Sequence, residues 1–157
     1  MTVAEEIAAS MGSDWLPTVY EEKVRSLRTR SYDFDVPERE NTAEIQHTLL
    51  GIELKVGKHR MACPDLSTAR YLRVFARLGC RSVAVPYDVS VIPGLADELE
   101  SSWQRTLLRI VERTKGDSQA VRSRVRSLVV KEIREEVAKI GAGEKMPLFK
   151  TSTKQRK

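Results

Sequence analysis

The sequence predicts an α/β or α+β protein with a small mixed sheet, flanking helices and a C-terminal helical hairpin. Short apolar runs with strand-like alternation occupy the middle of the chain. After Gly94, apolar residues instead recur every three or four positions over two long stretches. The chain has 157 residues, of which 41% are hydrophobic, enough to form one core. We expect a single domain over residues 1–141 with the hairpin at 94–141, followed by a mobile basic tail at 142–157.

The first part of the chain predicts two helices, a strand and a β-hairpin. Residues 2–11 predict a short helix ending at Gly12, and a second helix, with Pro17 in its first turn, continues to about residue 29. The alternating segment SYDFDV, residues 31–36, predicts a strand. Residues 45–56 and 60–63 predict two further strands joined at Gly57 and Lys58.

A helix and a buried strand follow this β-hairpin. Asp65 or Ser67 can cap the helix, which we expect to run to Leu78 and to end at Gly79, a residue that tolerates positive φ. RSVAVPYD, residues 81–88, predicts a short buried strand. Two long helices, separated by the stop-and-cap segment TKGDS, then carry apolar stripes at Leu95, Leu99, Trp103, Leu107 and Ile110, and at Val121, Val125, Leu128, Ile133, Val137 and Ile140.

Positive charge collects toward the C-terminus. The net charge is +5, residues 1–22 carry five acids and no base, and residues 101–141 carry ten bases and five acids. The last sixteen residues carry five bases and one acid. A basic end of this kind suits nucleic acid or another polyanion, and it is also found in proteins that only need solubility.

Other features disfavour several classes of protein. No apolar run approaches the roughly 20 residues that cross a bilayer, and the N-terminus is acidic, so we expect a cytoplasmic protein without a membrane segment. The two cysteines, Cys63 and Cys80, lie in apolar surroundings typical of buried thiols, and His47 and His59 do not complete a metal-ligand cluster with them. Phosphate-binding glycine loops and a serine nucleophile elbow are both absent.

The segment GIELKVG holds the strongest catalytic signal. In a strand, residues i and i+2 project from the same face, so Glu53 and Lys55 are expected to point together. A metal-dependent nuclease needs carboxylates around Mg²⁺ and benefits from a nearby lysine that stabilises charge on the phosphate. The competing interpretation is a solvated charge pair on an exposed strand face.

The segment IELKVGKHRMACPDLSTARYLRVFARLGCRSVAVPYD resembles the central part of the archaeal-type Holliday-junction resolvases. These belong to the PD-(D/E)xK, restriction-endonuclease-like superfamily, and the resemblance covers about residues 18–88. It implies a restriction-endonuclease-like core, with a helix acid at Glu21 or Glu22, a strand acid at Asp35 or Asp33, and the motif itself at Glu53 and Lys55. The implied Mg²⁺ ligands are Glu22, Asp35 and Glu53. This chain departs from the family at Pro37, because a charged loop with a further carboxylate, Glu44, separates the strand acid from the motif.

Arginines at helical spacing form a second candidate site. Arg70, Arg73 and Arg77 share one face of the predicted helix, with Arg81 just beyond it, and such a row can follow phosphates. Arg122 and Arg126, together with the basic tail, can widen this surface. The alternative is a solvated outer face of the helix.

Two functions therefore follow from the sequence. The first is a protein that acts on nucleic acid, as a Mg²⁺-dependent nuclease in which Asp35, Glu53 and Lys55 are catalytic and the arginines bind the backbone. The second is a non-catalytic assembly or adaptor protein whose amphipathic hairpin, residues 95–140, binds a protein partner or a second copy in a homodimer.

Overall fold

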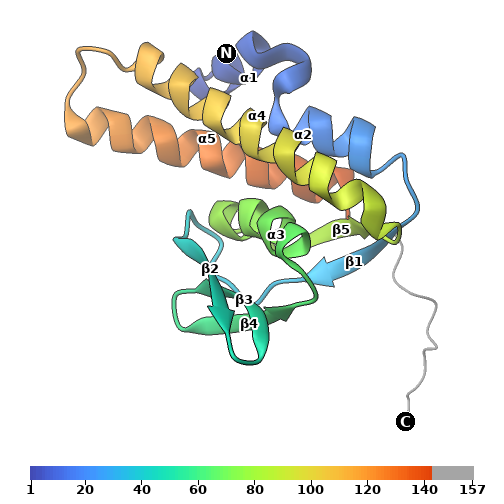
Figure 1. Cartoon of the computed structure of the whole chain (residues 1–157). Helices are drawn as coiled ribbons and strands as arrows, with labels where there is room; N and C mark the ends of the chain where they lie inside the picture. The colour runs from blue at the N-terminus through green and yellow to red at the C-terminus, as the bar shows by residue number, and fades with distance from the viewer. Residues whose placement is uncertain (143–157) are drawn as a thin grey trace.

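The computed structural model describes residues 1–142, which have an α+β architecture (Figure 1). Its buried apolar side chains form one core cluster that extends from α1 to α5. The predicted tail at 142–157 lies outside the described residues except for Ala142. The helices are α1 (Val3–Met11), α2 (Leu16–Val19), α3 (Leu66–Leu78), α4 (Ile92–Arg113) and α5 (Gln119–Ile140), and the strands are β1 (Thr29–Asp33), β2 (Ala43–Thr48), β3 (Gly51–Val56), β4 (His59–Cys63) and β5 (Ser82–Pro86).

The antiparallel hairpin of α4 and α5 organises the molecule. In Figure 1, α1 and α2 lie on one side of the hairpin, and α3 with the strands lies on the other. Both helices have close to the predicted bounds. α4 ends at Arg113, and Ser118 caps α5 by accepting a hydrogen bond from the N–H of Val121. The predicted hairpin is therefore confirmed.

The strands form two antiparallel sheets, so the prediction of one mixed sheet was wrong. β1 pairs with β5, while β2, β3 and β4 form a separate three-stranded meander. Among residues 1–142, β5 pairs with β1 alone, and the two strands run antiparallel. Both sheets therefore lack the parallel neighbours that a mixed sheet requires.

The predicted strand at 45–56 is in fact a hairpin of its own. It turns at Leu49 and Leu50, where the hydroxyl of Thr48 accepts a hydrogen bond from the N–H of Leu50 and Gly51 has a φ of 123°. The hairpin predicted at Gly57 and Lys58 is confirmed. The second helix also differs from its prediction, because α2 continues only as a π-helical turn from Tyr20 to Val24 and ends well before residue 29.

Helix α3 ends where the sequence predicts. The carboxylate of Asp65 accepts a hydrogen bond from the N–H of Thr68, and Gly79 closes the helix in the left-handed conformation at φ 75°. One face of α3 covers β2 and β3, where Leu54 and Val56 are buried. The predicted strand at 81–88 is β5, which lies in the core.

Two buried tyrosines hold β5 in place. The hydroxyl of Tyr20 accepts from the N–H of Ala84 at 2.8 Å and donates to the carbonyl of Gly141 at 2.6 Å. The hydroxyl of Tyr71 donates to the carbonyl of Ala84 at 2.5 Å. Burial raises the pKa of Tyr20 to about 12, so its hydroxyl keeps the proton that this network needs. The network ties the end of α5 to the sheet.

A pair of glutamates on α5, one of which contacts the start of α2, makes stability depend on pH. Glu132 and Glu136 lie one turn apart on α5, so a protonated Glu132 can share its proton with Glu136, and Glu136 accepts from the indole N–H of Trp15 at 2.9 Å. The hydrogen bond between the two carboxyl groups, followed by burial and the negative charges of Glu136 and Glu5, raises the pKa of Glu132 to about 7, although Lys139 lowers it in part. The folded protein therefore binds this proton more tightly than the unfolded chain does.

Replacing Glu132 with glutamine should remove this pH dependence. The stabilisation from the shared proton is complete below the unfolded pKa of 4.5 and is lost as the pH rises through about 7. The amide of Glu132→Gln can donate to Glu136 at any pH, so the variant should melt at a higher temperature than the parent at pH 8. At pH 5 the gap between their melting temperatures should shrink. An equal gap at both pH values would contradict the shared proton.

Candidate functional site

The Glu-x-Lys motif lies on the outer face of the three-stranded sheet. Glu53 and Lys55 project from the face of β3 opposite the buried Leu54 and Val56, as the sequence predicts. The carboxylate of Glu53 lies 3.5 Å from a guanidinium nitrogen of Arg60 on the neighbouring strand. This contact is a cross-strand charge pair on the face of β3 that points away from the buried Leu54 and Val56.

The three predicted metal ligands are not brought together. The carboxylate of Asp35 is almost fully exposed and lies 3.8 Å from Nδ1 of His59. Within residues 1–142, no group of three or more His, Cys, Asp or Glu side chains that could hold a metal ion is found. Glu53 therefore does not join Asp35 and His59. Glu22 lies in another part of the fold, where it lines a groove between the π-helical turn and α4.

Glu44, rather than Asp35, shares a face with the motif. It lies directly opposite Lys55 in the β2–β3 pairing and is therefore a diagonal neighbour of Glu53. Diagonal neighbours on one face of an antiparallel pair are about 7–8 Å apart, within reach of two long side chains. The outer face of the sheet thus carries two carboxylates, one lysine and Arg60, which pairs with Glu53.

Two arginines of the α3 row, Arg70 and Arg73, face α4 and are neutralised there. Arg70 donates to Asp97 at 2.5 Å and to Glu100 at 2.6 Å, and Arg73 donates to Glu100 at 3.3 Å. Arg77 reaches only a backbone carbonyl, that of Ala43, at 3.5 Å. Burial, followed by the charge of Arg73, lowers the pKa of Arg77. The three side chains share a face, as expected, but on this face Arg70 and Arg73 contact α4 and Arg77 contacts β2.

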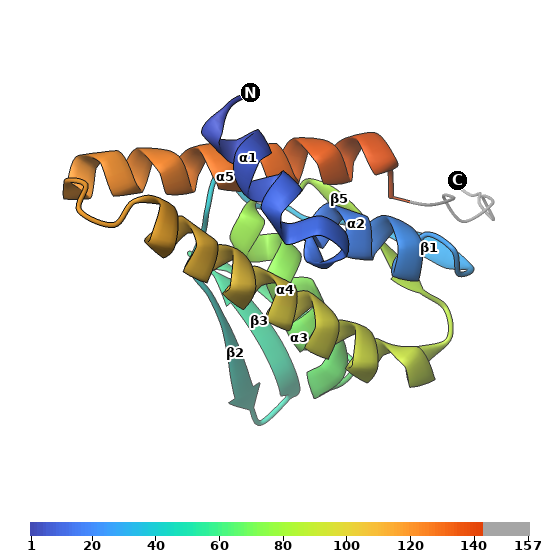
Figure 2. The same ribbon diagram turned by 90° about the horizontal axis from the view of Figure 1, so that it is seen from above.

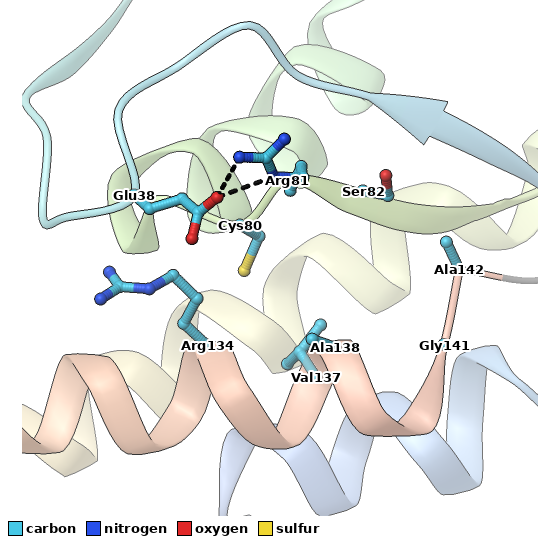
Figure 3. Close-up of a pocket in the computed structure, with 9 residues that line it drawn as sticks. All are labelled: Glu38, Cys80, Arg81, Ser82, Arg134, Val137, Ala138, Gly141 and Ala142. Atoms are coloured by element: carbon cyan, nitrogen blue, oxygen red, sulfur yellow. Dashed lines mark hydrogen bonds and ion pairs between the residues drawn. The ribbon is translucent and has the colours of Figure 1, made fainter.

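Arg81 also has an acidic partner within the chain. Its Nε donates to Glu38 at 2.7 Å beside a pocket between α5, the start of β5 and the loop after β1 (Figure 3). Cys80 lies at the base of this pocket, where burial raises the pKa of its thiol to about 12. A thiol with so high a pKa stays protonated at neutral pH and is a poor nucleophile. This pocket therefore offers no reactive cysteine.

Arg126 and Arg122 have different surroundings. Arg126 makes a bidentate ion pair with Glu40 and lies over the ring of Trp103, 5.9 Å from its centroid. Arg122, one turn earlier on α5, has no acidic partner among residues 1–142. Of the six predicted nucleic-acid-binding arginines, Arg77 and Arg122 alone have no ion pair with an acid in this part of the chain.

The free end of the helical hairpin carries a surface that combines apolar and basic groups. In both Figure 1 and Figure 2 the connection between α4 and α5 projects beyond α1 and α3. A groove there, which we call the hairpin-end groove, is lined from both helices. Its lining residues are Ile110, Val111, Thr114, Lys115, Gln119, Arg122, Ser123 and Arg126.

The apolar part of this surface is well exposed. Val111 is 65% exposed, and Leu108, one turn earlier on the same side of α4, is 63% exposed. Beside them, Lys115 and Arg122 lack an acidic partner within residues 1–142. Residues 105–126 contain seven bases and two acids, an excess of five positive charges.

Sequence reasoning did not single out Leu108, Val111 and Lys115. The signal was present in the doublets Leu107–Leu108 and Ile110–Val111, which make the apolar stripe of α4 wider than one facing helix covers. Leu107 and Ile110 are covered by the core, whereas the second member of each doublet remains outside.

The chain matches none of the protein families, curated proteins or solved structures with which it was compared. The residues and their geometry therefore carry the functional argument alone. Among the helices of residues 1–142, none is both long and apolar enough to span a membrane.

Proposed function

We propose that this protein is a non-catalytic assembly or adaptor protein that binds a protein partner at the hairpin-end groove. The observation that carries the proposal is the exposure of Val111 and Leu108 next to Lys115 and Arg122 on a projecting pair of helices. Large apolar side chains at the rim of a groove, beside charged groups, are typical of protein interfaces.

The same surface is less suited to nucleic acid. A phosphate backbone rewards positive charge but offers no apolar surface to cover Val111 and Leu108. Two of the three arginines of the α3 row, which the nucleic-acid interpretation needed, already have acidic partners at Asp97 and Glu100. The charge at the hairpin end is thus better explained by attraction of an acidic protein surface.

A photo-reactive amino acid in place of Val111 should cross-link a protein partner in extracts of the native cell. The matched control is the same photo-reactive residue at Lys58, which is exposed in the turn between β3 and β4. We expect one or a few cross-linked proteins, identified by mass spectrometry, at position 111 and not at position 58. Reversing the charge of Lys115 and Arg122 should weaken these cross-links.

Two results would contradict this proposal. One is a set of cross-linked proteins that is the same at positions 111 and 58. The other is cross-linking that is unchanged by charge reversal in a variant whose circular dichroism spectrum and melting temperature match those of the parent.

A second candidate is a Mg²⁺-dependent nuclease on the outer face of the sheet. It is favoured by one observation, the shared face of Glu44, Glu53 and Lys55. Glu53 and Glu44 would hold the ion, which would activate a water molecule when bound, and Lys55 would stabilise charge on the phosphate. The ligand set implied by the resemblance, with Asp35 and Glu22, does not fit these positions.

Cleavage assays separate this candidate from the binding function. Labelled branched, duplex and single-stranded DNA and RNA would be incubated with the protein, with and without Mg²⁺ or Mn²⁺. Metal-dependent cutting that is lost in both Glu53→Ala and Glu44→Ala would support the nuclease. Cutting that persists in Glu44→Ala, or no cutting by a folded parent protein, would overturn this version of the site.

A further inference from the structure

Resting on the proposed function, we infer that the partner segment seated in the hairpin-end groove is an acidic amphipathic helix of about two turns. The groove lies between two antiparallel helices, and a third helix is the element that packs into such a depression. Along α5 it extends from Gln119 to Arg126, which corresponds to about 10 Å at 1.5 Å per residue. This length matches two helical turns.

The charge of the groove selects an acidic segment. Lys115, in the turn after α4, and Arg122 on α5 both line it, and neither has an acidic partner within the described chain. Arg126, at the end of the groove nearer the core, is paired with Glu40, so its charge is already neutralised. A bound helix with carboxylates at intervals of three or four residues can face Lys115 and Arg122 from one side.

The apolar groups of the groove require the other face of the bound helix to be apolar. Ile110 is buried at its base, whereas Val111 stands exposed on the same helix. Covering Val111 needs apolar residues at i and i+3 or i+4 of the partner. An extended acidic segment would leave this side chain largely in water.

The molecule already uses the same arrangement elsewhere, with the charges reversed. Near its N-terminal end, α4 presents Asp97 and Glu100 to the arginines of the amphipathic helix α3. At its other end, α4 presents the exposed Val111 beside Lys115 of the following turn, and no helix of residues 1–142 covers Val111. An acidic helix there would complete the hairpin as α3 does at the opposite end.

A titration with designed peptides tests this inference on the full chain. The probe is a fluorescein-labelled, capped 14-residue helical peptide with leucine on one face and glutamate on the other. A scrambled peptide of the same composition has no apolar face, and a third peptide carries lysine for glutamate. We expect the acidic amphipathic peptide to bind with a dissociation constant on the order of 10–100 µM, as suits a small interface, and both controls to bind at least about 10-fold more weakly.

Matched variants locate the binding. Lys115→Glu with Arg122→Glu, and separately Val111→Asp, should each weaken binding at least about 10-fold. Lys58→Glu with Lys131→Glu makes the same change in net charge at exposed positions outside the groove and should leave binding within about twofold. Equal binding of the scrambled peptide, equal loss in the control variant, or preferential binding of a 20-base-pair DNA duplex would each overturn the inference.

Failure of this inference can be told apart from failure of the proposed function. If position 111 cross-links a specific protein but the acidic helix neither binds nor competes with that cross-link, the hairpin end binds a partner of other chemistry. If position 111 cross-links nothing specific, the binding function itself fails.

Discussion

Replacing Gly79 with alanine should lower the free energy of unfolding by roughly 2–5 kcal/mol, the sum of left-handed backbone strain and an overlap in the core. Gly79 has a φ of 75°, and a Cβ added there would lie 2.3 Å from the backbone oxygen of Arg39 and 2.5 Å from its nitrogen. The loop cannot easily retreat, because the N–H of Asn41 donates to the carbonyl of Arg77 at 2.8 Å and its side chain donates to Pro37 and Ala76.

Gly116→Ala is the matched control for this loss. Gly116 also has a positive φ, 86°, but a Cβ added there meets nothing within 4 Å. It should cost only the backbone strain, about 1–2 kcal/mol. Urea denaturation followed by tryptophan fluorescence would measure both variants. Equal losses would mean that the loop after β1 does not press on the end of α3 as described.

Replacing Arg70 with methionine should destabilise the protein by about 1–2 kcal/mol, an estimate discounted for partial exposure. The guanidinium bridges Asp97 and Glu100, and removing it leaves two carboxylates of α4 near each other without that cation. Methionine keeps much of the apolar stem, so the loss reports the charge. The loss should shrink in 1 M salt, which screens partly exposed pairs.

Arg122→Met tests the same substitution at an arginine without an acidic partner in the described chain. It should change stability by less than about 0.5 kcal/mol, as is usual for exposed positions. Arg70→Met should in turn leave binding of the acidic helix unchanged. A loss of binding in Arg70→Met without a loss of stability would show that the row on α3 is a binding surface after all.

The sequence predicts α3 well because its signals are local. An aspartate cap, a helical repeat and a glycine stop all act within neighbouring turns, and the structure confirms each of them. The turn at Leu49 and Leu50 was not predicted, because its local sequence signal is weak. It lacks the Asn-Gly pair that is typical of a tight turn, and the two leucines at its tip instead predict a continuous strand.

The surroundings of the arginines could not be predicted, because they depend on contacts between distant segments. Helical spacing places Arg70, Arg73 and Arg77 on one face, which is correct. Nothing in that spacing shows that the face meets Asp97 and Glu100, 27 to 30 residues later in the chain. The antiparallel pairing of β1 with β5 is equally non-local, since it joins residues separated by the whole three-stranded meander.

The candidate site at Glu53 depends partly on local strand geometry and partly on non-local strand pairing. The shared face of Glu53 and Lys55 follows from strand geometry alone and is observed. The carboxylate beside them is set by the pairing of β2 with β3, which brings Glu44 to that face and leaves Asp35 with His59.

The most direct test of the hairpin end as the binding surface is amide chemical-shift mapping of the isotope-labelled full chain during titration with the acidic amphipathic peptide. We predict that the largest shifts fall at residues 110–123, with smaller changes along α3. Shifts centred on the outer face of β2, β3 and β4, or no shifts at millimolar peptide, would contradict the assignment of binding to the hairpin-end groove.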